Sequence, residues 1–233
     1  MAVKQYELVA ERLRDRVVLG ELQPGERLPN ESTLATDFGV SRATVREALR
    51  VLAAQNLIRT SKGAGGGSYV TLPSVGGVSA FVQSSISMLA DADNVTLEEL
   101  LEARELLEVP AARLAAMRRS EEELELLREA IPDEPLRLGP QRQFVYNQDF
   151  HLIVIEGSRN QLLMIAAQPV FEVLQRNLAR SKLGARFHRT INEHHRAIVA
   201  AIENGDADQA GSEMYGHLEF LRPYYERAWR ASR

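Results

Sequence analysis

The stretch that decides the fold is FGVSRATVREALRVL, residues 38–52. Gly39 is a typical residue for ending a helix, and Ser41 can cap the next helix by accepting a backbone N–H on its side-chain oxygen. The apolar residues that follow recur at spacings of three and four: Ala48, Leu49, Val51 and Leu52. This spacing predicts a helix with one buried face, so the stretch has the outline of a helix-turn-helix.

The other face of this helix carries Arg42, Thr44 and Arg46 near its N-terminus. An arginine guanidinium can bind guanine O6 and N7 together in the DNA major groove, and a helix N-terminus also favours phosphate. The alternative is a solvated helix with ordinary surface arginines. The helix taken alone does not decide between these two interpretations.

The flanking segments complete a winged-helix pattern. Helices are predicted over Tyr6–Leu19 and Glu31–Phe38, before the opening stretch. Two short strands are predicted after it, over Leu57–Thr60 and Ser68–Thr71, with a glycine-rich turn between them. Gly63 in this turn would let the backbone approach a sugar–phosphate edge, and Lys62 beside it supplies a charge. A flexible glycine-rich loop is the alternative.

Composition places the chain among ordinary globular proteins. Its 233 residues suit one or two domains, and 45% are hydrophobic. The absence of cysteine fits a cytoplasmic protein, and no apolar run predicts a signal peptide or a membrane span. Residues 1–72 carry ten Lys and Arg against eight Asp and Glu, whereas residues 73–233 carry 18 against 24. Any DNA contact is therefore expected at the N-terminal end.

The rest of the chain is predicted to be a second, all-α domain. Residues 73–77, rich in Pro, Ser and Gly, are interpreted as a linker between a winged helix-turn-helix domain over 1–72 and a helical bundle over 78–233. Helix-length periodic segments separated by Gly, Pro, Ser and Asp breaks predict helices at about 78–90, 96–118, 120–130, 138–156, 159–181, 189–203 and 206–230. The predicted fold class is mainly α.

Three of these helices each turn one histidine toward the core: His151, His195 and His217. A single inward histidine is usually a core residue bonded to a carbonyl, but three of them favour a shared metal site. Asn147 lies one turn before His151 on the same face. Imidazole and amide ligands suit a divalent ion such as zinc, nickel or manganese. His194 points about a hundred degrees away from His195, and a shift of the helix by one residue would exchange them.

Helix 96–118 places a charge where its pattern calls for an apolar residue. Arg104 falls in the stripe Leu97, Leu100, Leu107, Ala111 and Leu114. A buried guanidinium needs a partner, which an incoming carboxylate or phosphate would supply. An internal ion pair with Glu105 or Glu108, or a side chain that reaches solvent, is the alternative.

The segment from Gly20 to Val70 resembles the DNA-binding domain of the GntR family of bacterial transcription regulators, through LxPGxxLPxE and FGVSRxTVREALRxL. The resemblance implies DNA contacts from the recognition helix, its cap and the wing: Ser41, Arg42, Thr44, Arg46, Lys62 and Gly63. After LPxE the family usually has an arginine, whereas this chain has Ser32. That contact is therefore expected to be a weaker hydrogen bond, and Arg42 and Arg46 to carry more of the recognition.

Residues 78–230 resemble the effector-binding helical domain of the FadR subfamily within that family, an FCD-type domain. The resemblance is carried by LEELLEARELLEVPAARLAA, by an NxxxFH element and by EHHRAIVAAIENGDADQA. It implies that Asn147, His151, His195 and His217 are metal ligands. Asparagine in place of the commoner aspartate removes one negative charge from the site.

The sequence thus predicts a DNA-binding transcription regulator, most simply a repressor and not an enzyme. A homodimer would place two recognition helices on a palindromic operator, and a small carboxylate bound to the metal and Arg104 would control operator affinity. A metal-dependent hydrolase or lyase is one alternative, but no HExxH-like arrangement or pair of inward carboxylates supports it. A ligand-free structural DNA-binding protein is the other.

Overall fold

The computed structural model describes residues 4–61, 63, 66–133, 140–178 and 183–231. Within these ranges the chain forms ten helices and one two-stranded sheet. It divides into two compact units, Met1–Ser74 and Val75–Arg233. The first holds the two strands and the second is entirely helical, so the predicted mainly α fold class is confirmed.

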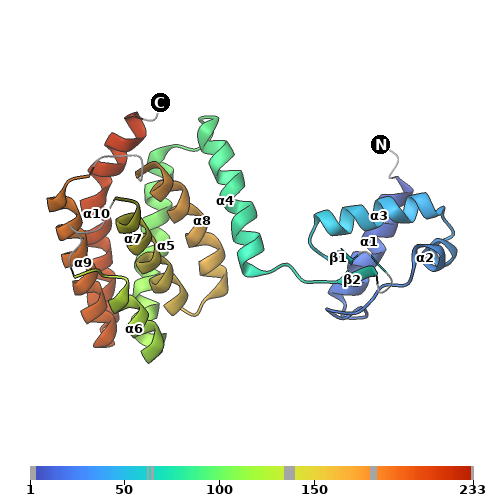
Figure 1. Ribbon diagram of the computed structural model, residues 1–233, viewed down its shortest axis with the longest axis horizontal. Coiled ribbons are helices and arrows are strands. Elements are labelled where there is room, and N and C mark those ends of the chain that lie inside the picture. Colours follow the sequence, from blue (N-terminus) through green and yellow to red (C-terminus); the bar gives the residue numbers. More distant parts are fainter. Residues whose placement is uncertain (1–3, 62, 64–65, 134–139, 179–182, 232–233) are drawn as a thin grey trace. The chain divides into compact units, whose positions relative to one another are not determined.

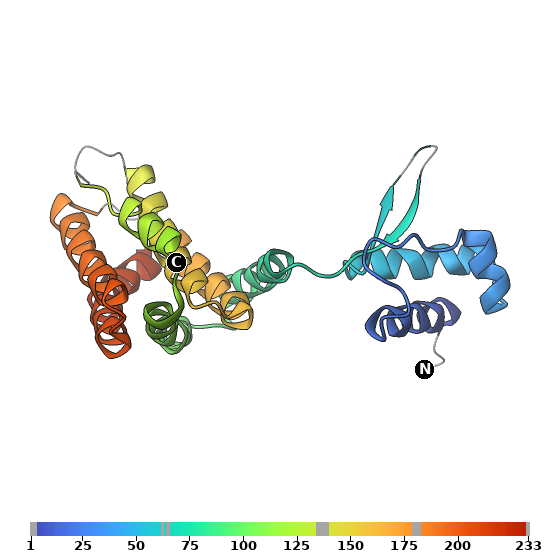
Figure 2. The ribbon, with the colours of Figure 1, turned by 90° about the horizontal axis from the view of Figure 1, so that it is seen from below.

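Three helices and a hairpin make up the first unit: α1 (Gln5–Val18), α2 (Glu31–Phe38), α3 (Arg42–Ala54), β1 (Ile58–Ser61) and β2 (Gly67–Val70). Helix α3 packs against α1, α2 and β1. Figure 2 shows the hairpin extending from one side of α3, with α1 on the other side. Leu13, Val45 and Leu52 are buried where α1 meets α3.

The turn between α2 and α3 follows from local chemistry. Helix α2 ends at Gly39, whose φ of +64° is a left-handed conformation that favours glycine. Two residues later Ser41 Oγ accepts the backbone N–H of Thr44 at 3.1 Å and caps α3. Because the end of one helix and the cap of the next are both encoded within three residues, the angle between α2 and α3 is fixed locally.

The wing is anchored by a segment far from it in sequence. In the hairpin, Ile58 pairs with Val70 and Ser61 pairs with Gly67 in antiparallel register. Residues 25–28 lie along the other edge of β2: Gly25 N–H donates to Val70 O, Val70 N–H to Glu26 O, and Leu28 N–H to Ser68 O, each at 2.8 Å. The turn before α2 therefore holds the base of the hairpin by backbone hydrogen bonds along the outer edge of β2.

The second unit contains α4 (Val75–Asp91), α5 (Leu97–Arg118), α6 (Glu121–Glu129), α7 (Pro140–Gly157), α8 (Gln161–Leu178), α9 (Ala185–Glu203) and α10 (Ala207–Ala231). Helix α5 contacts α7, α8, α9 and α10, and Figure 1 shows it running through the middle of the bundle. Side chains on α5 therefore face four other helices. Among the described residues, no helix combines the length and the apolar character that a membrane crossing requires.

Two expected boundaries are wrong. The sequence predicts a linker over 73–77, but residues 75–77 form the first turn of α4. The N–H groups of a first turn need no partner within the helix, so two glycines there are tolerated when the rest of the helix packs, as α4 does on α8. Helix α9 starts at Ala185 rather than 189 because Phe187 is buried against the bundle.

Candidate functional site

The N-terminal end of α3 is a polar, solvent-exposed surface. Ser41 and Arg42 are exposed and Thr44 is half-buried. The Ser41 hydroxyl lies 2.8 Å from the Thr44 hydroxyl in addition to capping the helix. Arg42 contributes to a positive potential that helps to lower the pKa of Glu31. This end of α3 thus offers hydroxyl groups and a cation to a partner in solution.

Arg46 is held in one orientation by α2. Its Nε lies 3.2 Å from Glu31 Oε1, and its terminal nitrogen lies 2.9 Å from Glu31 Oε2. The Arg46 side chain is 54% exposed. The hydrogen bond from Arg46 lowers the pKa of Glu31, so this carboxylate is ionised at pH 7 and the pair persists. The guanidinium is therefore oriented while much of it stays accessible.

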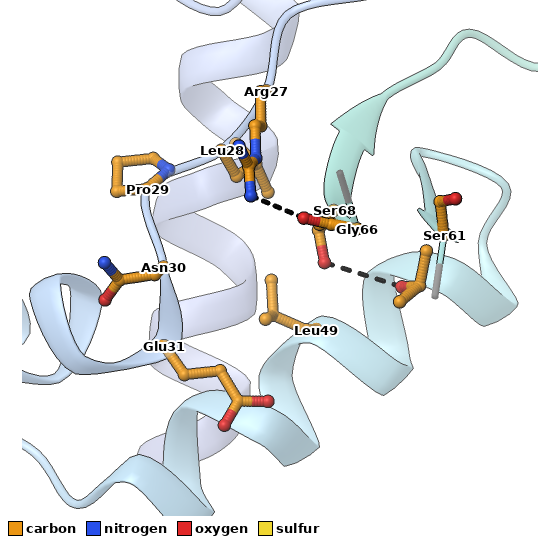
Figure 3. Close-up of a pocket in the computed structure, with 11 residues that line it drawn as sticks. Arg27, Leu28, Pro29, Asn30, Glu31, Leu49, Ser61, Gly66 and Ser68 are labelled. Carbon is orange, nitrogen blue, oxygen red and sulfur yellow. Dashed lines mark hydrogen bonds between the residues drawn. The ribbon is translucent and has the colours of Figure 1, made fainter. Parts of the chain in front are cut away.

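The other residues predicted to contact DNA lie around the same surface. Ser32 is exposed in the first turn of α2, and Gly63 is exposed in the wing turn with a φ of +107°. Lys62 lies outside the described residues. A cleft of about 560 Å³ runs between the turn before α2 and the hairpin. Figure 3 shows Arg27 at one end of this cleft donating a hydrogen bond to Gly66 O, with Glu31 at the other end and Ser61 and Ser68 on the side of the hairpin.

In the second unit, three histidines from three helices meet in the core. His151 on α7 is 0% exposed, and His195 on α9 and His217 on α10 are each 1% exposed. One ring nitrogen from each lies within 4.8 Å of the other two. Nitrogen ligands at roughly 2.0–2.1 Å from a tetrahedral zinc lie roughly 3.3 Å apart, so small ring movements would complete such a site.

The chemistry of these rings suits a metal ion. Burial, followed by the neighbouring imidazoles, lowers the pKa of His195 and His217 well below the usual value. Burial also lowers the pKa of His151, although Glu108 opposes that shift. The rings are therefore neutral at pH 7, as metal ligands must be. Within the described residues, His195 Nε2 is buried without a hydrogen-bond partner, a cost that metal ligation would remove.

Aromatic rings fix the histidines in place. The Phe150 ring stacks on His195 with centroids 3.7 Å apart and planes 7° from parallel. The structure groups His195, rather than His194, with the other two histidines, whereas His194 is half-buried with its ring edge-on to Phe220. Asn147 is half-buried one turn before His151. Its role as a ligand stays a prediction.

Arg104 is fully paired inside the bundle. Its side chain is 2% exposed, and its Nε donates to Glu108 Oε1 at 2.5 Å. A terminal nitrogen donates to Tyr225 Oη at 2.6 Å, and the guanidinium lies 5.0 Å from the Phe171 ring centroid. Of the partners left open by the sequence, Glu108 is the one that Arg104 takes. The void beside Arg104 measures about 10 Å³, roughly the space of one water molecule, so a carboxylate would have to open it.

Comparison with known proteins identifies both units. Residues 5–67 match the model of bacterial regulatory proteins of the gntR family, and residues 99–220 match the FCD domain. A protein of Escherichia coli (strain K12), described as a regulator of an L-lactate dehydrogenase operon, is 31% identical over 94% of this chain and 85% of its own length. The chain belongs to the GntR family. It is a DNA-binding transcription regulator with an FCD domain, not an enzyme, and the hydrolase or lyase alternative is set aside.

Other GntR proteins support this assignment. The transcriptional regulator LutR of Bacillus subtilis (strain 168) is 30% identical over 89% of this chain and 96% of its own length. The structure of Streptococcus agalactiae GntR is 29% identical, covers 94% of this chain and 99% of its own, and superposes with a TM-score of 0.66. These similarities extend over both the DNA-binding unit and the helical unit of this chain.

Sequence reasoning missed several residues of this GntR protein that surround the histidines. Tyr225 and Gln175 extend the buried network from Arg104, with Tyr225 Oη donating to Gln175 Oε1 at 3.4 Å. Glu108 also contacts His151. The sequence indicates only its pairing with Arg104. The i,i+4 spacing of Arg104 and Glu108 signals their ion pair, but no local signal identifies a partner on another helix.

Proposed function

We propose that this GntR protein is a one-component repressor whose operator affinity is controlled by a small carboxylate metabolite, bound to a divalent metal ion in the FCD domain. The observation that carries the proposal is the group of three buried, neutral histidines from α7, α9 and α10, with an unpartnered nitrogen on His195, beside a buried arginine. Such a group costs folding energy unless it binds something. His151, His195 and His217 would hold the ion, with Asn147 as a further ligand.

The charge of the site favours an anionic effector. The three imidazoles are neutral, and an asparagine ligand would add no charge. Arg104 and Glu108 neutralise each other. A bound divalent ion would therefore leave two positive charges in a buried site, and a carboxylate ligand would offset part of this cost. The metal would act by attracting and orienting that carboxylate.

L-Lactate is the first effector to test, since one relative is described as an L-lactate dehydrogenase operon regulatory protein. The screen extends to other small hydroxycarboxylates, because they offer the same carboxylate and hydroxyl groups. Effector binding would act on DNA affinity by favouring one arrangement of the two DNA-binding units in a homodimer, as two recognition helices must match a palindromic operator. A coupling of 1–3 kcal/mol changes affinity by about 5- to 150-fold.

The test uses operator DNA selected from a random-sequence library by the full-length protein. Fluorescence anisotropy gives the affinity for this DNA with zinc, with a chelator, and with each acid of the panel. We expect one acid to change the affinity at least about fivefold, only in the zinc-loaded protein. His195→Gln should abolish this response, whereas His194→Gln, altered at the neighbouring position, should keep it. An unchanged response in the chelator-treated protein would refute the metal-dependent mechanism.

A further inference from the structure

Glu108 is a buried carboxylate that metal and effector binding, as proposed above, do not use. It lies on α5 one turn after Arg104 and is 1% exposed. Burying an ionised carboxylate costs free energy unless nearby charges and hydrogen-bond donors replace the water that it loses. The guanidinium of Arg104, itself 2% exposed, lies 2.5 Å from this carboxylate and supplies the compensating charge, so Glu108 is the anionic member of a buried ion pair.

The two oxygens of Glu108 serve different partners. Oε1 accepts a hydrogen bond from Arg104 Nε at 2.5 Å, and Oε2 lies 2.7 Å from His151 Nδ1. Because an ionised carboxylate can only accept, the Nδ1 of His151 must carry the proton. The neutral His151 ring is then the tautomer that has its lone pair on Nε2.

The same contact fixes where that lone pair points. His151 Nε2 lies 3.2 Å from His217 Nε2, on the side of the ring that faces the other histidines. Within the described residues, the group of ligand atoms includes His151, His195 and His217 but not Glu108. Glu108 thus lies behind His151, with the metal position in front. Arg104 contacts both oxygens of the carboxylate and so restricts its rotation, and one of its terminal nitrogens also lies 3.3 Å from His151 Nε2.

We infer that Glu108 is a positioning residue for the metal centre: its carboxylate holds His151 as the Nδ1–H tautomer with Nε2 directed at the ion. This role rests on the metal site proposed above. A carboxylate behind a ligating histidine fixes the ring and raises its basicity, and loss of such a partner typically weakens metal affinity about 10- to 100-fold.

The test measures Zn²⁺ affinity of the full chain by competition with a chromogenic chelator. Glu108→Gln keeps the size of the side chain and removes its charge, and we expect affinity to fall about 10- to 100-fold. Glu102→Gln is the matched control, because Glu102 is an exposed glutamate on the same helix. It should bind Zn²⁺ as the wild type does.

A purely structural role would give a different result. Glu108→Gln leaves the Arg104 charge buried without its partner, which by itself disturbs the bundle. The double variant Arg104→Met with Glu108→Gln removes both charges and keeps the fold if the single variant does not. If Glu108 positions His151, the double variant has the same reduced Zn²⁺ affinity as Glu108→Gln. Recovery of wild-type affinity in the double variant would overturn the inference.

A second readout uses the metal-free protein. In ¹⁵N-histidine NMR spectra at neutral pH, His151 should be the Nδ1–H tautomer in the wild type and a mixture of tautomers in the double variant. An unchanged tautomer would also overturn the inference. Wild-type protein that fails to bind Zn²⁺ would instead refute the proposed metal site itself, so the two failures are distinguishable.

Discussion

Replacing Arg46 with alanine isolates the part that one recognition-helix guanidinium plays in DNA binding. The side chain is 54% exposed, and Glu31 holds it without covering it. An exposed ion pair contributes little to folding, so Arg46→Ala should unfold at nearly the wild-type temperature. The guanidinium is nevertheless oriented before DNA arrives. Less of its conformational freedom is lost on binding, and its contribution to affinity is correspondingly larger.

The size of the effect follows from its chemistry. One bidentate arginine–guanine contact is worth roughly 5- to 150-fold in affinity. In a homodimer on a palindrome both helices change, and the factors multiply to roughly 25-fold at the low end. The loss should be accompanied by relaxed base preference at one position of each half-site, with little change in the salt dependence of binding.

The assay is fluorescence anisotropy on the selected operator and on its single-base variants, at several salt concentrations. Arg50→Ala is the matched control, because Arg50 lies one turn further along α3, is 68% exposed and pairs with Glu47. We expect that variant to retain base preference. If Arg46→Ala bound the operator within about twofold of the wild type, or if Arg50→Ala lost as much, the assignment of Arg46 to base recognition would be refuted.

Three further predictions follow from packing and charge. Gly66→Ala should weaken DNA binding, seen by anisotropy, because its Cβ would lie 2.7 Å from Ser61 O and 2.8 Å from Gly63 O, and these backbone atoms of the wing would have to move. Arg104→Met should lower the free energy of unfolding by about 3–5 kcal/mol, because Glu108 loses the guanidinium that balances its buried charge; calorimetry should find a Tm lower by roughly 6–20 °C. The metal-free protein should lose stability as pH falls below about 6.5, because its buried imidazoles have lowered pKa values and resist the protonation that the unfolded chain undergoes. Glu108, with its pKa lowered from 4.5 to about 2, adds a second loss between those pH values; thermal melts from pH 7.5 to 3 measure both.

The elements that the sequence predicted well are those whose signals are local. Gly39 and Ser41 set the end of one helix and the start of the next within three residues, and the apolar spacing of α3 selects its buried face. The inward positions of His151, His195 and His217 follow from helical periodicity in the same way. The predicted end of the linker is wrong because α4 begins within it. The glycines there favour a loop, and the packing of α4 against α8, which stabilises the helix, has no local sequence signal.

By itself the sequence determined a winged helix followed by a helical bundle, the family, and three inward histidines, because helix caps and periodicity act over a few residues. Only the tertiary structure decided how the histidines and Arg104 are paired. The i,i+4 spacing of Arg104 and Glu108 indicates their ion pair, but the contact of the other carboxylate oxygen with His151 depends on the packing of α7 against α5. The segment over residues 25–28 likewise contacts the wing through the hydrogen bond from Leu28 N–H to Ser68 O, forty residues along the chain. Contacts of this kind depend on how helices and strands pack, and no local pattern encodes them.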